Sequence, residues 1–322
     1  MRLATQWIAA VLLIAATAPS MAQQAYPNRL ITIIVPLSLG TGADIIARIF
    51  AAKMAERLGV GVVVDNKPGA GSIVGTELAS RAPADGYTLL MAPTSYALQP
   101  ALDKTARYDI FKSFAPVALI ATGALAFAVS DGTPARTIRE FAALAKARPG
   151  VLSYASPGNG TPQHLAMELF KLDAGADILH VPYKDTASST RDLAAGVVNA
   201  MIVPVYTIAP LVQAAKVRVL ASLGEERSAV FANAPTLKEE GFPSVNVQVW
   251  VGAMVPAATP PEIVEKLNAE MNAVLALRDV KGLLEKQGLV TVGGRPERLS
   301  DLVKSDYARW TRAIAAAKIR AD

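Results

Sequence analysis

A strand that leads through a glycine-containing loop into a helix occurs twice in this chain, and this pattern restricts the fold more than any other feature. The first unit covers residues 31–49: a β-branched strand at Ile31–Val35, a loop, and an apolar-periodic helix that begins near Gly42. The second unit covers residues 154–170. Backbone N–H groups at a helix start are unpaired and carry partial positive charge, so each loop suits an anion such as a carboxylate. An ordinary strand-to-helix turn is the alternative for each loop.

Short apolar strands alternate with helical segments along most of the chain, and this alternation predicts an α/β fold with parallel βαβ units. Further strands are expected at residues 60–64, 87–92, 114–117, 124–129, 152–155, 178–181, 200–203, 217–223 and 290–292. Further helices are expected at residues 138–147, 163–172, 188–195, 208–215, 261–277, 280–287 and 296–317, with a short one after Ala234.

Two apolar segments, residues 121–129 and 245–255, are interpreted as connections that cross between two domains. The first domain then consists of residues 23–124 and 248–322, and the second of residues 125–247. The chain has 322 residues, 52% of them hydrophobic, which is enough for two buried cores at roughly 100–200 residues per domain.

Residues 1–22 have the pattern of a secretory signal peptide. Arg2 is the basic start, residues 7–18 form an apolar run, and Ser20 and Ala22 are small residues at the positions that signal peptidase reads. A retained membrane anchor is the alternative, but the run is shorter than the roughly 20 residues that a span requires. We expect cleavage after Ala22 and a mature protein in the periplasm.

The absence of cysteine excludes disulfides, thiolate metal sites and a lipoprotein attachment site. The formal net charge is +5, and the basic residues are scattered without a basic block or an aromatic-interleaved stripe. Nucleic acid is therefore not an expected partner.

Two features that suggest cofactor or enzyme chemistry are weak. The glycines from Gly69 to Gly75 look like a dinucleotide fingerprint, but residues 66–68 separate them from the preceding strand, where the first glycine should lie. His164 and His180 are the only histidines, and neither has a carboxylate or a second histidine at ligand spacing. We therefore expect no cofactor, no metal and no enzyme activity, with structural or pocket-lining roles for both histidines.

The loop of the second unit carries a stronger signal. Ser156, Asn159 and Thr161 place hydroxyl and amide donors beside free backbone N–H groups, and Pro162 suits the first position of the helix that follows. Such a loop binds a carboxylate without an arginine. A helix start that caps itself uses the same residues, and both interpretations stay open at this point.

Several spaced motifs together resemble one protein family over essentially the whole chain after the signal peptide. They are Val35 and Pro36 with Gly40 and Asp44, and residues 65–71 (DNKPGAG), 84–90 (ADGYTLL), 114–117 (FAPV), 154–161 (YASPGNGT), 180–184 (HVPYK) and 234–236 (APT). On these residues the chain resembles the Bug, or TctC-type, extracytoplasmic solute receptors of tripartite tricarboxylate transporters.

The resemblance implies a type II periplasmic binding fold, in which two α/β domains close like a flytrap on a small carboxylic acid. It implies that the first strand–helix loop holds one carboxylate through backbone N–H groups near Gly40 and Thr41, with Asp44 organising that loop. It also implies direct hydrogen bonds from a loop at Thr94 and Ser95 and, in the other domain, from Ser156, Asn159 and Thr161. The implied partners are the carboxylate ligand and the membrane permease subunits, and the receptor is expected to be a monomer. A periplasmic sensor that contacts a histidine kinase is the alternative, because it needs the same pocket.

The chain departs from the family pattern at the pocket. The family usually has phenylalanine at position 37, where this chain has Leu37, and glycine at position 41, where it has Thr41. Tyr206 follows a strand end that usually carries an Asp-Asn pair. Leu37, Tyr206 and Trp250 are candidates for an apolar slot for an aromatic or longer aliphatic acid, and buried packing is the alternative for Trp250. Asp185 replaces a usual glycine; it pairs with a ligand amine or faces water, and water is the preferred interpretation.

Overall fold

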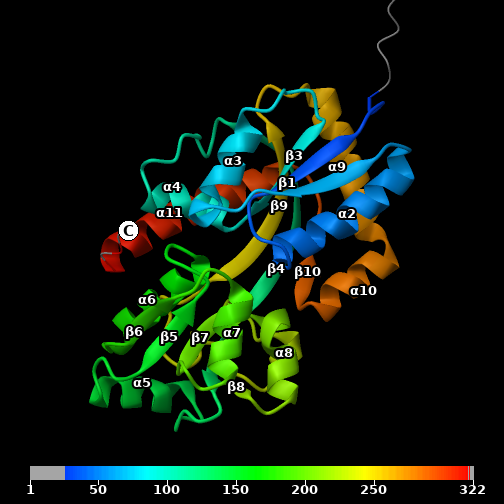
Figure 1. Cartoon of the computed structure of the whole chain (residues 1–322). Helices are drawn as coiled ribbons and strands as arrows, with labels where there is room; N and C mark the ends of the chain where they lie inside the picture. Colours follow the sequence, from blue (N-terminus) through cyan, green and yellow to red (C-terminus); the bar gives the residue numbers. More distant parts are fainter. Residues whose placement is uncertain (1–25, 318, 320–322) are drawn as a thin grey trace, which may run out of the picture.

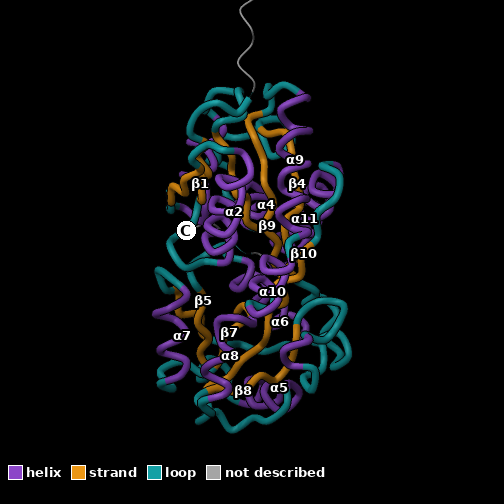
Figure 2. Tube along the Cα trace, turned by 90° about the vertical axis from the view of Figure 1, so that its right-hand side faces the viewer, coloured by secondary structure: helices purple, strands orange, loops and turns teal. Residues whose placement is uncertain are grey.

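The computed structural model describes residues 26–317 and residue 319, so the predicted signal peptide lies outside the described residues. Two α/β lobes are stacked along the long axis of the molecule, and strands pass from one to the other (Figures 1 and 2). None of the helices in the described part of the chain combines the length and the apolar character that a membrane span needs.

Lobe 1 contains the first strand–helix unit and the C-terminal helices. Its elements are β1 (Ile31–Val35), α2 (Gly42–Leu58), β2 (Val62–Asn66), the 3₁₀ helix η1 (Ala70–Ser72), α3 (Ile73–Ser80), β3 (Thr88–Pro93), α4 (Ser95–Leu102), α9 (Pro261–Ala276), α10 (Arg278–Lys286) and β10 (Leu289–Thr291). Strand β1 pairs with β2 and β3 in parallel, as the βαβ pattern predicts.

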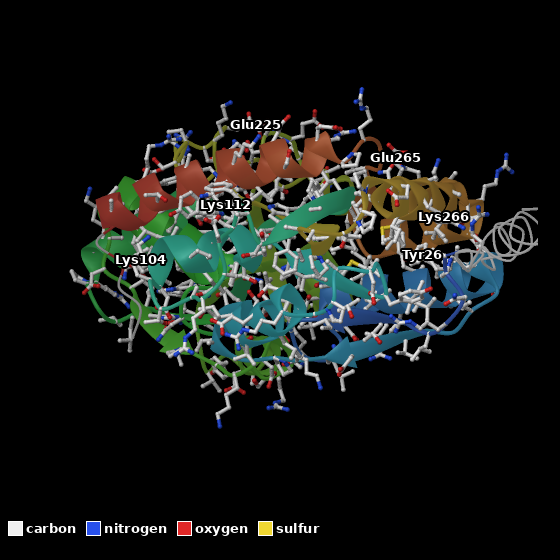
Figure 3. All side chains as sticks on the ribbon, turned by 90° about the horizontal axis from the view of Figure 1, so that it is seen from above. Tyr26, Lys104, Lys112, Glu225, Glu265 and Lys266 are labelled. Carbon is white, nitrogen blue, oxygen red and sulfur yellow. The ribbon has the colours of Figure 1, made fainter. Side chains whose placement is uncertain are left out.

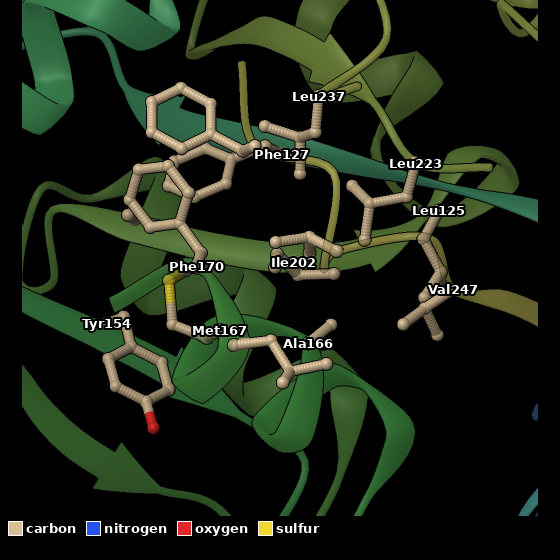
Figure 4. Close-up of a cluster of buried hydrophobic side chains, with 14 of the residues drawn as sticks. Leu125, Phe127, Tyr154, Ala166, Met167, Phe170, Ile202, Leu223, Leu237 and Val247 are labelled. Atoms are coloured by element: carbon tan, nitrogen blue, oxygen red, sulfur yellow. The ribbon is translucent and has the colours of Figure 1, made fainter. Parts of the chain in front are cut away.

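Lobe 2 contains the second unit. Its elements are α5 (Ile138–Ala147), β5 (Ser153–Ser156), α6 (Pro162–Ala174), β6 (Leu179–Pro182), α7 (Thr186–Ala194), β7 (Ala200–Pro204), α8 (Val205–Gln213), β8 (Val217–Ser222) and the 3₁₀ helix η2 (Ala229–Phe231). Its core includes the tilted rings of Phe127 and Phe170, with Leu237 and Val247 from the return of the chain (Figure 4).

Two long antiparallel strands join the lobes: β4 (Phe114–Ser130) and β9 (Gln248–Pro256). Strand β4 pairs with β9 and β10 in lobe 1 and with β7 and β8 in lobe 2. The prediction of two separate strands at residues 114–117 and 124–129 is therefore wrong. Gly123, in the middle, is no break: a β-carbon there would lie 2.8 Å from the Leu289 side chain, so it allows β10 to pack closely. The predicted domain division falls inside β4 and at the start of β9, and it stays a prediction.

Two local predictions are wrong near lobe contacts. The segment at Thr94 and Ser95 was expected to be a loop, but Ser95 begins helix α4. The short helix expected after Ala234 is a single turn, in which Glu240 N–H bonds to Thr236 O at 3.2 Å. Thr236 also forms an isolated parallel β-bridge with Ser222. This bridge holds the segment in an extended conformation beside β8, so a longer helix does not form.

Helix α11 (Glu297–Ala317) packs against both lobes. Leu299 and Val303 belong to a hydrophobic cluster of lobe 1, whereas Trp310 and Ala313 belong to the core of lobe 2. The prediction that the last helix returns to the first domain therefore describes only its first half. Charged side chains of both signs are exposed around the molecule, including Lys104, Lys112, Glu225, Glu265 and Lys266 (Figure 3).

Candidate ligand-binding site

Loops from both lobes meet between them. Lobe 1 contributes the β1–α2 loop and the corner between β3 and α4, and lobe 2 contributes the β5–α6 loop and the corner between β7 and α8. The Gln99 Nε2 atom donates to Gly160 O at 2.9 Å across the boundary. The backbone of Gly42 hydrogen-bonds the Tyr206 hydroxyl, also across the boundary. Each loop thus contacts the opposite lobe, the β5–α6 loop through Gln99 and the start of α2 through Tyr206; that the two loops face each other across one ligand stays a prediction.

Asp44 organises the β1–α2 loop, as the resemblance implied. Its carboxylate accepts hydrogen bonds from Gly40 N–H at 2.9 Å and from Asn66 Nδ2 at 3.0 Å, and it pairs with Arg48 at 3.0 Å. Asn66 Nδ2 also donates to Leu37 O at 3.1 Å. Burial alone would raise the pKa of Asp44, but the bonds from Arg48, Gly40 and Asn66 outweigh it and lower that pKa.

This arrangement affects the predicted anion contacts of the loop. In this conformation the Gly40 amide donates to the Asp44 carboxylate, so Asp44 takes the place that a ligand carboxylate would fill there. Thr41 makes no side-chain cap for α2, and its hydroxyl donates to Ser38 O at 2.9 Å. Leu37 is half-buried and packs against the core of lobe 1. Ligand contact by Leu37, Gly40 and Thr41 stays a prediction.

The hydroxyls of Thr94 and Ser95 lie in the corner after β3 and are buried. Thr94 Oγ1 accepts from Trp250 N at 2.7 Å and donates to Trp250 O at 3.2 Å. Ser95 Oγ donates to Ser72 Oγ at 2.9 Å. Trp250 itself is only 3% exposed, and its indole N–H donates to Asp306 Oδ2 at 2.7 Å. These bonds join β3, β9 and α11, so Trp250 has the buried packing that was the alternative to ligand contact. Direct ligand contact by Thr94, Ser95 and Trp250 stays a prediction.

The β5–α6 loop shows the self-capped geometry that was one of its two interpretations. Thr161 Oγ1 accepts from His164 N at 3.3 Å and donates to Gly158 O at 2.9 Å. Ser156 is fully buried, and its hydroxyl lies 2.7 Å from His180 Nε2. Asn159 is exposed at the tip. The cap leaves the second interpretation, contact with an anion, as a prediction for Ser156, Asn159 and Thr161.

Tyr206 reaches from α8 to the start of α2. A β-carbon on Gly42 would lie 3.0 Å from the Tyr206 hydroxyl, so only glycine allows this approach without displacement. Burial raises the pKa of Tyr206, although the bonds from Gly42 and Thr207 act in the opposite direction. The Tyr206 hydroxyl thus lies at the helix start where an anion was expected, and its role as a ligand contact stays a prediction.

Asp185 is exposed and caps α7 by accepting from Ser188 N at 2.7 Å. The hydrogen bonds from Ser188 lower the pKa of Asp185.

The glycines around the apparent dinucleotide fingerprint have packing roles. A β-carbon on Gly75 would lie 2.6 Å from Lys67 O and 2.7 Å from Pro36 Cα. Glycine at this position therefore allows α3 to pack directly against the loops that follow β1 and β2. Within the described residues, no group of three or more histidine, aspartate or glutamate side chains is placed to hold a metal ion.

Sequence reasoning missed two residues at this site. Gln99 lies on helix α4, which was not predicted, and its partner Gly160 is 61 positions away. Asn66 lies within the motif of residues 65–71, which was used for the resemblance but not assigned a role. The amide of Asn66, directly after a strand that neighbours β1, was the available signal.

Thr161→Val tests the two interpretations of the β5–α6 loop. The loss of the cap is expected to lower the free energy of unfolding by about 1 kcal/mol. If Thr161 also contacts a charged ligand, the substitution weakens the free energy of binding by roughly 1.5–3 kcal/mol. We expect both the loss of stability and the loss of affinity. Thr137→Val is the matched control, because Thr137 caps α5 by accepting from Glu140 N at 3.1 Å, outside this site. Unchanged affinity in Thr161→Val would refute the ligand contact.

Comparisons with known proteins identify the family. Residues 46–319 match the model of the TctC family, described as the tripartite tricarboxylate transporter family receptor. The UPF0065 protein in the tcbD-tcbE intergenic region of Pseudomonas sp. (strain P51) is 37% identical, over 98% of this chain and 95% of that protein. BugT of Bordetella pertussis is 32% identical, over 93% of each chain.

Two solved structures with ligands have the same fold. Rpa4515 of R. palustris with adipate superimposes with a TM-score of 0.86 at 32% identity, over 92% of this chain and 99% of that one. MatC of Rhodopseudomonas palustris with bound malate gives 0.82 at 29% identity, over 90% and 100%. The two-domain binding fold and the assignment as a receptor rather than an enzyme are confirmed. The chain belongs to the TctC family of tripartite tricarboxylate transporter receptors.

Proposed function

We propose that this protein is a periplasmic receptor that captures a small carboxylate between its lobes and delivers it to the permease subunits of a tripartite tricarboxylate transporter. The observation that supports the proposal is that both helix starts lie at the boundary between the lobes: the start of α2 contacts Tyr206 of lobe 2, and the loop before α6 contacts Gln99 of lobe 1. A ligand that contacts both lobes stabilises their closed arrangement by its differential affinity for it.

The chemistry of the boundary supports a carboxylate. The side chains there are hydroxyls and amides, and the helix starts add partial positive charge, so an anion is held without a dedicated arginine and is released readily. The neighbours with adipate and malate bind acids of this kind. Leu37 and Tyr206 add apolar surface, which favours a di- or tricarboxylate with an apolar middle, or an aromatic acid, over a short and fully polar acid.

A thermal-shift screen of residues 23–322 against mono-, di- and tricarboxylates, aromatic acids and amino acids tests this function. An acid at 100 times its dissociation constant is expected to add about 2.7 kcal/mol, which is a few degrees of midpoint for a protein of this size. Denaturation followed by mass spectrometry checks for a ligand that is already bound. An empty protein whose midpoint no acid shifts would contradict the proposal.

The membrane partner needs a separate measurement. Capture of the permease subunits by the ligand-loaded receptor is the expected result of a pull-down from solubilised membranes. Capture of a histidine-kinase ectodomain in its place would assign the same ligand-gated closure to sensing.

A further inference from the structure

The two peptide groups on either side of Gly160, in the β5–α6 loop, are held by side chains of different lobes. The carbonyl of Gly160 accepts from Gln99 Nε2 at 2.9 Å, and the N–H of Gly160 donates to His164 Nδ1 at 3.1 Å. Gln99 is on α4 of lobe 1 and is 4% exposed, whereas His164 is on α6 of lobe 2 and is 7% exposed. The backbone on both sides of Gly160 is therefore fixed by two buried side chains that belong to different lobes.

Two glycines make room for the Gln99 side chain. Gly71 of lobe 1 has φ +62°, and a β-carbon there would lie 2.0 Å from Gln99 Nε2. Gly160 has φ +68°, and a β-carbon there would lie 2.4 Å from Leu102 and 3.0 Å from Gln99. Both positions combine left-handed backbone with a contact that no side chain tolerates. The Gln99 amide is thus enclosed between the η1 segment and the β5–α6 loop.

The two histidines connect Gly160 to the other end of the β5–α6 loop. The rings of His164 and His180 are stacked, with centroids 4.2 Å apart and planes inclined by 10°. Tyr154 extends the stack, with its ring centroid 4.7 Å from that of His180. His180 Nε2 lies 2.7 Å from the hydroxyl of Ser156, where the loop begins. One rigid stack therefore contacts the loop at its first residue and, through His164, at Gly160.

The contact between His164 and Gly160 depends on protonation, whereas that between His180 and Ser156 forms with either a neutral or a charged ring. His164 Nδ1 accepts a hydrogen bond, so it carries no proton. Burial, the adjacent His164 and Lys171 lower the pKa of His180 to about 4. Glu168 acts in the opposite direction, but its effect is smaller than theirs combined. Glu168 accepts from the Tyr154 hydroxyl at 2.6 Å and from Lys171 at 2.9 Å, so its charge is already paired. The stack therefore keeps its hydrogen-bonding pattern at neutral pH.

We propose that His164, His180 and Gln99 are positioning residues for the ligand: the stacked histidines hold both ends of the β5–α6 loop, and Gln99 joins that loop to lobe 1. None of the three needs to touch the ligand. This inference rests on the proposed function, because the loop matters through the acid that it holds.

Matched substitutions at the two histidines test the proposal, because asparagine reproduces the position of Nδ1 and glutamine that of Nε2. His164→Asn is expected to keep the bond to Gly160, and His164→Gln to lose it. The order reverses at position 180, where His180→Gln keeps the bond to Ser156 and His180→Asn loses it. Exchange of the Gly160 amide, followed by NMR in protein labelled with ¹⁵N-glycine and without ligand, is expected to accelerate at least tenfold in the two losing variants and less than threefold in the other two.

Affinity for adipate and for malate, measured by calorimetry, supplies the second reading. For whichever acid binds the wild type, the dissociation constant is expected to rise at least tenfold in the losing variants and in Gln99→Met. In the retaining variants it is expected to rise less than threefold. Equal effects of asparagine and glutamine at each position, in exchange and in affinity, would overturn the positioning roles. If neither acid binds the wild type, the choice of acids is wrong, and the exchange rates of ligand-free protein still decide the inference.

Discussion

Asp44→Ala is expected to lower the free energy of unfolding by roughly 3 kcal/mol and to remove most ligand affinity. Asp44 is 3% exposed, and its loss removes the acceptor of the Gly40 amide, one of the two acceptors of Asn66 Nδ2 and the ion pair of Arg48. A fully buried donor that loses its acceptor costs about 1–3 kcal/mol; each of these losses costs less, because Gly40 is exposed and Asn66 is half-buried, and together they give the expected change. Urea unfolding gives the change in free energy, and calorimetry with the acid found in the screen gives the affinity.

Asp65→Ala is the matched control, since Asp65 is an exposed carboxylate that pairs with Lys67 at 3.1 Å. Its expected effect is about 0–1 kcal/mol. The pH dependence provides a second check. Because the fold lowers the pKa of Asp44 below its ordinary 3.8, its contribution is fully present above pH 3.8 and is lost as pH falls through the lowered value. The stabilities of the wild type and Asp44→Ala should therefore converge in acid; a constant difference would contradict the carboxylate's role.

Trp250→Ala is expected to lower the free energy of unfolding by about 3–5 kcal/mol, the range for a large buried aromatic side chain. The indole fills space in lobe 1 and donates to Asp306, which is itself 3% exposed. Burial raises the pKa of Asp306, against the effects of Arg309 and Trp250, so the loss of the indole donor leaves a carboxylate with less compensation.

Trp250→Phe separates the packing role of Trp250 from a role in the apolar slot. Phenylalanine keeps an apolar wall but not the bond to Asp306, so stability should fall by about 1–3 kcal/mol while the preference among acids stays the same. A change in preference with unchanged stability would instead place Trp250 in the apolar slot. Phe111→Ala serves as the control, because Phe111 is 51% exposed on the same lobe and should change stability by about 1 kcal/mol or less.

Local sequence patterns predicted the elements whose causes are local. The strand Ile31–Val35, the helix that follows it and the helix at residues 138–147 agree with the structure, because β-branched runs, apolar periodicity and a capping side chain act within a few residues. Helix α4 was missed because it is short and contains Pro100, and contacts with α11 and η1 hold it in place. Strand β4 was divided because a glycine ordinarily marks a strand end, whereas here it serves a close approach by another strand.

The site was predicted at the level of loops but not of atoms. The positions of the two loops follow from the topology of parallel strands. Which hydroxyls face a ligand depends on partners far away in sequence: Thr94 bonds to a residue 156 positions later, and Ser156 to one 24 positions later. No pattern along the chain encodes these pairs, so the sequence predicted neutral donors without the partners that only the fold supplies, and their contact with a ligand stays a prediction.

The attachment of α11 to both lobes makes the two ends of the protein unequal for engineering. Because Leu299 is fixed in lobe 1 and Trp310 in lobe 2, separation of the lobes must bend or slide this helix. A bulky tag or a surface linkage directly after Ala317 is therefore expected to hinder opening, and a small environment-sensitive dye there should report each capture event. The described chain begins at the end of lobe 1 that lies away from lobe 2 (Figure 1), so immobilisation through that end should leave ligand exchange unaffected.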